Sequence, residues 1–168
     1  MARSSIRAHV RGEWHVRGNL EGLARGLDGR EMSAALLEGA RVYARVMRSL
    51  APKASGVLQN AIYAFNAYQS DFAGGKGSRR VRIKLRPNEA MAVASSKVAH
   101  LAEFGTHAHR IAPRRRRALA LGNGVIVASA AHPGARAHPF WRPALYQGEA
   151  EATRAVVSAA STLVEKFD

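Results

Sequence analysis

The side chains best suited to metal chemistry lie in one short stretch. His100, Glu103, His107 and His109 fall within ten residues, and imidazole combined with carboxylate is a common ligand set for first-row metals. His100 and Glu103 share a helix face only at a spacing of three, and Gly105 is expected to break the helix before the other two histidines. The His-Glu-x-x-His order is also missing. We therefore expect a solvated or interfacial histidine cluster rather than a metal site, and no cofactor.

Other catalytic patterns are weaker still. The chain has no cysteine and only twelve carboxylates, and no serine lies in a Gly-x-Ser-x-Gly turn. Residues 74–78, Gly-Gly-Lys-Gly-Ser, lack the Gly-x-x-x-x-Gly-Lys-Ser/Thr spacing of a phosphate-binding loop. These residues are expected to form a flexible loop. The sequence thus predicts a protein that is not an enzyme.

Positive charge is the strongest chemical signal. The net charge is +14, and residues 71–137 alone carry thirteen Lys/Arg against three Asp/Glu. Such a surface could contact DNA or an acidic partner, or simply face solvent. In an extended run, neighbouring side chains point to opposite faces, so at most two of the four consecutive arginines would address one surface. The candidate contacts are Arg80, Arg82, Lys84, Arg110, Arg114, Arg115, Arg116 and Arg117.

The length of 168 residues fits one domain with a real hydrophobic core. Residues 1–18 mix arginine with Trp14 and Val16 without a helical repeat, which favours an extended arm or an edge strand, and residues 19–168 would form the domain. No apolar run approaches the roughly 20 residues of a membrane span. A soluble protein is the expectation.

Two long helices are predicted, after a short one over residues 19–27. In residues 30–50 a stripe of large and small apolar residues recurs at steps of three and four, made of Leu36, Ala40, Tyr43, Met47 and Leu50. Ala51-Pro52 should end this helix. From about Pro139 onward a narrower stripe follows, made of Leu145, Gly148, Ala152, Val156, Ala159 and Leu163. Its small residues suit close helix packing.

The strand signals are shorter. Residues 57–68 could begin as helix and continue as strand. Residues 80–86 alternate basic and apolar side chains, which predicts a strand paired with a second one at 91–94. Residues 97–104 suit a short helix, and two apolar runs around Gly122-Asn123-Gly124 predict a β-hairpin. The expected fold is α+β, with two long helices packed on a small antiparallel β-sheet and a projecting, acid-free hairpin inserted at about residues 106–137.

Several of these segments, in this order, resemble the tail-completion and head-tail joining family of long-tailed bacteriophages. Residues 99–106, Ala-His-Leu-Ala-Glu-Phe-Gly-Thr, are similar to the family signature aromatic-x-x-Phe/Val-Glu-Phe-Gly-Thr, with His100 and Leu101 as departures. Residues 54–62 resemble its Pro-x-x-Thr-Gly-x-Leu-x-x-Ser-Ile segment, with Ser55 and Ala61 as departures. The motif positions are Gly56, Leu58, Glu103, Phe104, Gly105, Thr106, Pro139, Phe140 and Pro143.

The resemblance implies a structural protein of the virion, assembled in the host cytoplasm. It implies a homo-oligomeric, hexameric ring at the top of the tail that contacts the tail tube protein and the connector or neck proteins. In such a scaffold Phe104 would anchor a helix end, Gly105 would allow the chain to reverse, and Phe140 with Trp141 would anchor the last helix. The alternative hypothesis is a basic DNA-binding module that uses residues 79–86 and 110–117.

Overall fold

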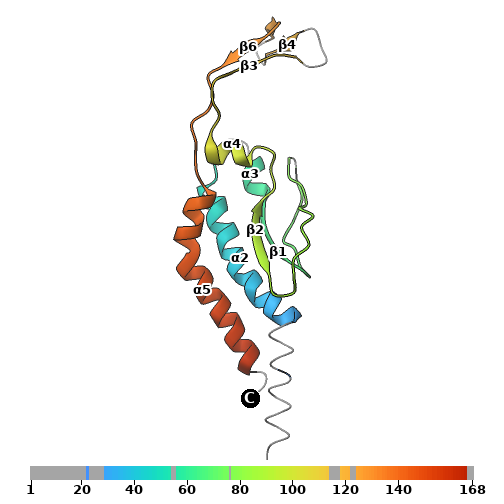
Figure 1. The fold of residues 1–168 in the computed structure, drawn as a ribbon, viewed down its shortest axis with the longest axis vertical. Helices are drawn as coiled ribbons and strands as arrows, with labels where there is room; N and C mark the ends of the chain where they lie inside the picture. Colours follow the sequence, from blue (N-terminus) through green and yellow to red (C-terminus); the bar gives the residue numbers. More distant parts are fainter. Residues whose placement is uncertain are drawn as a thin grey trace, which may run out of the picture.

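The computed structural model is a mixed α+β protein (Figure 1). It describes residue 22 and residues 29–53, 56–75, 77–113, 118–121 and 124–165. The predicted arm at 1–18 and most of the predicted short helix at 19–27 lie outside this part. Among the described residues, no helix is both long enough and apolar enough to span a membrane.

The helix α2, Arg30–Leu50, has the bounds that the sequence predicts. It ends at Ala51, whose extended backbone fits a residue that precedes proline. Its buried surface is wider than the predicted stripe, because α2 contacts the helix α5 on one side and the strands β1 and β2 on another. Residues such as Leu37 and Ala44 are therefore buried, whereas Leu36, Tyr43 and Leu50 are only half-buried.

A two-stranded antiparallel sheet lies against α2. The short helix α3, Val57–Asn60, leads directly into β1, Ile62–Asn66, so the predicted change from helix to strand in this segment is confirmed. The predicted strand at 91–94 is also confirmed as β2, Ala90–Ala94, but its partner was predicted wrongly. It pairs with β1, from Ile62 opposite Ala94 to Asn66 opposite Ala90.

The alternating segment at 80–86 is not a strand. Alternation of basic and apolar residues indicates only that one side of an extended chain is apolar. A strand also needs a second strand with which its backbone can form hydrogen bonds. Here the segment crosses the sheet, where the Val81 N–H donates to the Tyr63 hydroxyl at 2.6 Å. Val81 and Leu85 are half-buried, whereas Ile83 and the basic side chains between them are exposed. The segment therefore covers the outer face of the sheet instead of extending it.

The last helix, α5, spans Trp141–Glu165 and packs along α2. Across the molecule, Figure 1 shows α5, then α2, then the β1–β2 sheet, and last the segment at 80–86, which we call the covering segment. The prediction that both long helices pack on the sheet is therefore wrong for α5, which forms an outer layer. Its buried side is Ala144, Gly148 and Ala152, while Leu145 is exposed. Small residues let the two helix backbones approach closely.

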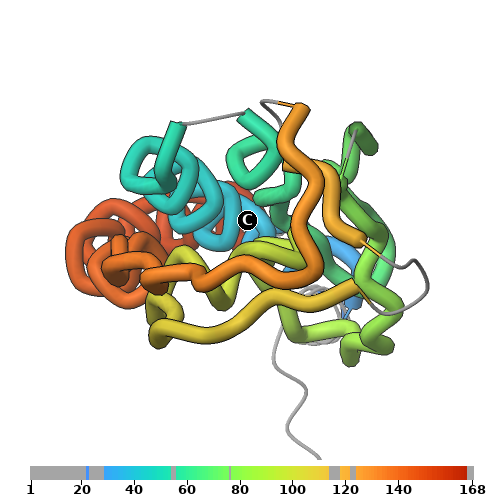
Figure 2. Tube along the Cα trace, turned by 90° about the horizontal axis from the view of Figure 1, so that it is seen from above, coloured from blue at the N-terminus to red at the C-terminus, as the bar shows by residue number. Residues whose placement is uncertain are grey.

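A long two-stranded ribbon leaves the body after the helix α4, Ala99–Phe104. Its lower part pairs β3, His109–Ile111, with β6, Ala130–His132. Its upper part pairs β4, Leu119–Ala120, with β5, Ile126–Val127, which confirms the predicted hairpin. Figure 1 shows the ribbon extending beyond α4, away from the body, and Figure 2 shows it from above.

Candidate functional site

The helix α4, the base of the ribbon and the start of α5 meet at one junction, and Glu103 of α4 forms hydrogen bonds with α5 there. This carboxylate is buried at the end of α4. It accepts backbone N–H groups from Phe140 at 2.9 Å, Trp141 at 3.0 Å and Arg142 at 3.3 Å. These donors are at the start of α5, where the first N–H groups of a helix have no partner within the helix. Glu103 thus caps α5 from another helix and places its negative charge at the positive end of the α5 dipole.

The pKa of Glu103 reflects this environment. Burial acts to raise the pKa, because it disfavours the charged carboxylate. The three backbone donors and the nearby Arg142 charge act in the opposite direction and outweigh burial, so the net shift is downward. Glu103 is therefore a fixed anion that serves the α5 terminus. It is not a group poised for proton transfer near neutral pH.

Gly105 and Thr106 begin the ribbon at this junction. Gly105 has φ of 71°, a left-handed value, and a Cβ there would lie 2.6 Å from the Ala135 carbonyl oxygen. Thr106 and Ala135 exchange backbone hydrogen bonds of 2.9 and 3.0 Å. His138 then donates its N–H to the Ala102 carbonyl at 2.8 Å. The two ends of the ribbon are thus fixed to each other and to α4.

The aromatic residues at the junction divide into a buried and an exposed group. Phe140 is 1% exposed and lies in the main hydrophobic core. Phe104 is 62% exposed and Trp141 46%, so of the three expected aromatic anchors only Phe140 is buried. The Arg142 guanidinium lies 5.3 Å from the Phe104 ring centroid. The junction therefore presents aromatic surface outward, beside the base of the ribbon.

The remaining motif residues have local structural positions. Gly56 has φ of 68° and precedes α3, whose Leu58 is buried in the core. Pro139 precedes α5, and Pro143 lies in its first turn, where a missing N–H costs no helical hydrogen bond. Their membership of a family motif stays a prediction.

The histidines do not converge on Glu103. The His109 ring stacks on His132 across the ribbon, with ring centroids 4.9 Å apart, and its Nδ1 lies 2.9 Å from the His107 carbonyl oxygen. Within the described ranges, no three histidine or acidic side chains are grouped as metal ligands would be. Glu103, the carboxylate of the sequence cluster, is instead bound to backbone N–H groups.

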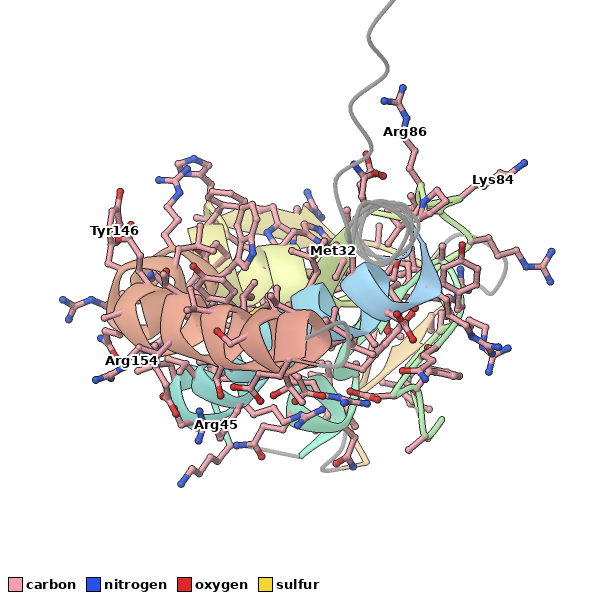
Figure 3. All side chains as sticks on the ribbon, turned by 90° about the horizontal axis from the view of Figure 1, so that it is seen from below. Met32, Arg45, Lys84, Arg86, Tyr146 and Arg154 are labelled. Carbon is pink, nitrogen blue, oxygen red and sulfur yellow. The ribbon has the colours of Figure 1, made fainter. Side chains whose placement is uncertain are left out.

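The predicted basic contacts that the structure describes lie in two places, the segment at 80–86 and the ribbon. Arg80 lies over the Phe72 ring at 5.6 Å, Arg82 and Lys84 are exposed on the covering segment, and Arg110 donates to the Ser129 hydroxyl at 2.8 Å on the ribbon. The run at 114–117 lies outside the described residues. In Figure 3 Lys84 and Arg86 project from one side of the molecule and Arg45 and Arg154 from other directions. Of the candidate contacts that the structure describes, Arg80, Arg82 and Lys84 thus lie together on one segment and Arg110 lies on the ribbon.

Comparison with known proteins gave no match, whether to a family model, to a curated protein or to a solved structure.

Proposed function

We propose that this protein is a structural subunit of a tailed bacteriophage particle, which assembles into a ring that completes the tail and joins it to the head. It acts by stoichiometric docking. Its partners are further copies of itself, the tail tube protein and the connector or neck proteins. The proposal rests on the motif order in the sequence, and it gains support from the way the chain is built around the ribbon.

The observation that carries the proposal is the rigid attachment of an otherwise unsupported ribbon. A two-stranded ribbon is at best marginally stable in water by itself. This one nevertheless exposes large apolar side chains: Ile111, Leu121, Val125 and Ile126 are 38%, 40%, 47% and 72% exposed. At the same time its base is fixed by Glu103, Gly105 and the Thr106–Ala135 pair. A neighbouring subunit would supply the missing surface, which is the behaviour expected of an assembly arm.

The alternative function is DNA binding, favoured by the net charge of +14. Phosphate contacts make affinity fall steeply as salt rises. Against this alternative, the basic side chains that Figure 3 labels project from different sides of the molecule, and several large apolar side chains in the described part of the ribbon are exposed. Proteins that hold duplex DNA gather their charge on one face or stripe.

Electron microscopy of the purified protein distinguishes the two functions. Rings of uniform size formed without DNA are the expected result. The matched measurement is DNA affinity between low and physiological salt. An absence of rings together with tight, steeply salt-dependent DNA binding would favour the alternative.

A further inference from the structure

The two edges of the β1–β2 sheet differ in their backbone hydrogen bonding. On β1, the edge that faces away from β2 is covered: Arg48 donates to the Ile62 carbonyl at 2.8 Å, and the Asp71 N–H donates to the Ala64 carbonyl at 2.9 Å. Asn66 also donates its N–H to the Gln69 carbonyl at 2.8 Å. Each outward-facing position of β1 therefore has a partner.

The outer edge of β2 is open. The Ser95 N–H donates to the Ala61 carbonyl at 2.9 Å, and this bond continues the β1–β2 register. Hydrogen-bonded pairs alternate in an antiparallel sheet, so Met91 and Val93 bond to β1. Ala90, Ala92 and Ala94 then direct their backbone groups outward, and among the described residues these groups have no hydrogen-bond partner. The strand is uncharged and has no proline, so it lacks the usual protection of an edge.

Apolar grooves flank this edge on both faces of the sheet. On the inner face a groove of about 550 Å³ lies among α2, β2 and α5, lined by Leu36, Tyr43, Ala92, Ala152 and Val156. A second groove, of about 380 Å³, reaches round the same edge: Ile83, Met91 and Val93 line it on the outer face, and Met47, Ala94 and Phe140 line it from the inner face. The inner groove exists because the β2 residues that face α2 are alanines. An added strand would place alternate side chains in the two grooves.

Such a strand must be apolar on both faces, and the ribbon carries one. Residues 124–128 read Gly-Val-Ile-Val-Ala, a continuous apolar run typical of a strand buried on both sides. Leu121 donates its N–H to the Val125 carbonyl at 2.8 Å, so Ile126 is at the alternate, non-hydrogen-bonded position. Its backbone groups therefore point away from β4. The Ile126 side chain is 72% exposed.

Charge and distance both favour a second copy as the donor. Among the described residues that line the inner groove, the one charged side chain is the acidic Glu89. Residues 106–137, by contrast, contain arginines and no acidic residue. Figure 1 shows β2 and the upper ribbon on opposite sides of α4 along the long axis. A ribbon anchored at Glu103 and Gly105 extends toward a neighbour rather than toward its own β2.

We propose that the open edge of β2 binds residues 124–128 of a second copy as an added strand. This inference rests on the proposed function, since it names the contact that would join neighbouring subunits. The contact is heterologous: the ribbon of each copy meets the β2 edge of the next, so it can repeat around a ring.

The test compares self-association of the full-length wild type with two variants, by sedimentation velocity. Ala92→Pro removes an outward N–H without removing a bond to β1, which an edge strand tolerates. Ile126→Asp places a charge on the docking strand. Each should weaken self-association roughly tenfold or more, whereas Tyr146→Asp, at an 81% exposed position on α5, should not.

Mixing the two variants gives the decisive result. An Ala92→Pro copy keeps its ribbon and an Ile126→Asp copy keeps its β2 edge, so the mixture should form dimers at a concentration at which each variant alone is monomeric. No dimer in the mixture, with both variants folded by circular dichroism, contradicts the proposal. Self-association of either variant alone at the wild-type level also contradicts the proposal.

A second readout covers the case in which Ala92→Pro fails to fold. The chain has no cysteine, so Ala92→Cys and Ile126→Cys copies can be mixed under oxidising conditions. A disulfide between the two variants is expected, and Tyr146→Cys mixed with Ile126→Cys should give none. If the wild type stays monomeric and the first mixture gives no disulfide, the inference is wrong. Rings that form without this disulfide would overturn the inference alone and leave the proposed function standing.

Discussion

The Glu103 carboxylate on α4 accepts the backbone N–H of Phe140 at 2.9 Å, although the two residues are 37 positions apart in the sequence. The whole ribbon lies between them in the chain. This contact, with those to Trp141 and Arg142, makes the two ends of the ribbon part of one junction with α5. A scaffold that must present a projecting arm at a fixed angle needs such a closure at its base.

Replacing the capping carboxylate should destabilise the fold. Glu103→Ala leaves buried N–H groups of α5 without an acceptor, which costs about 1–3 kcal/mol of unfolding free energy. Glu103→Gln keeps one neutral acceptor and should cost less. Urea unfolding followed by circular dichroism measures both. The matched control is Glu149→Ala, an exposed acid on α5 that should change little. Equal losses for Glu103→Ala and Glu149→Ala would show that the cap is unimportant.

The same carboxylate predicts a pH dependence. Its folded pKa lies below the ordinary value of 4.5, so the charged form is favoured by folding. The stabilisation is fully present above the unfolded pKa and is lost as pH falls through the folded pKa. The difference in unfolding free energy between wild type and Glu103→Gln should therefore be largest near neutral pH and shrink as pH falls below the ordinary pKa of 4.5. A difference that grows on acidification would reverse the sign and contradict the assignment.

The contact between the long helices depends on Gly39. A Cβ there would lie 2.5 Å from Val156 Cγ2 and 3.3 Å from the Ala152 carbonyl oxygen. Gly39→Ala should therefore cost about 1–3 kcal/mol through overpacking, despite the better helix propensity of alanine. Val156→Ala removes the closest methyl group, so the double variant should be less destabilised than the two single costs predict. Thermal unfolding of all four proteins completes the cycle. Additive costs would mean that the residues do not interact.

The two phenylalanines of the junction should respond in opposite ways to truncation. Phe140 is 1% exposed and Phe104 is 62% exposed. Phe140→Ala creates a core cavity and should cost about 3–5 kcal/mol, whereas Phe104→Ala should stay within about 0.5 kcal/mol. Chemical denaturation measures both. A large loss for Phe104→Ala would indicate that its ring stabilises the monomer and is not free for a partner.

The sequence predicted elements whose signals are local. Periodicity and the residue before Pro52 predicted α2, Gly105 predicted the end of α4, and two apolar runs predicted the β4–β5 hairpin. It did not predict which surfaces meet. Alternation at 80–86 indicated an apolar side but could not show that this side covers the sheet without joining it.

The sequence predicted the candidate site only in part. The sequence placed Glu103, Gly105 and Phe140 in motifs, yet nothing in it indicates that a carboxylate at the end of one helix accepts hydrogen bonds from the start of another. That contact depends on the ribbon returning to its origin, a long-range property. Phe104 and Trp141 were expected to anchor helix ends, and both are exposed, because residue type alone does not decide exposure.

The most direct test of the central claim is to remove the upper ribbon and measure folding and assembly together. Residues 114–129 are replaced by a short glycine linker, which leaves β3, β6 and the Glu103 junction in place. Thermal unfolding reports on the body, and electron microscopy counts the fraction of tails joined to heads. We predict a melting temperature close to that of the wild type with joining lost. Global unfolding would show that the ribbon belongs to the core, and normal joining would show that it is dispensable; either result would contradict the account.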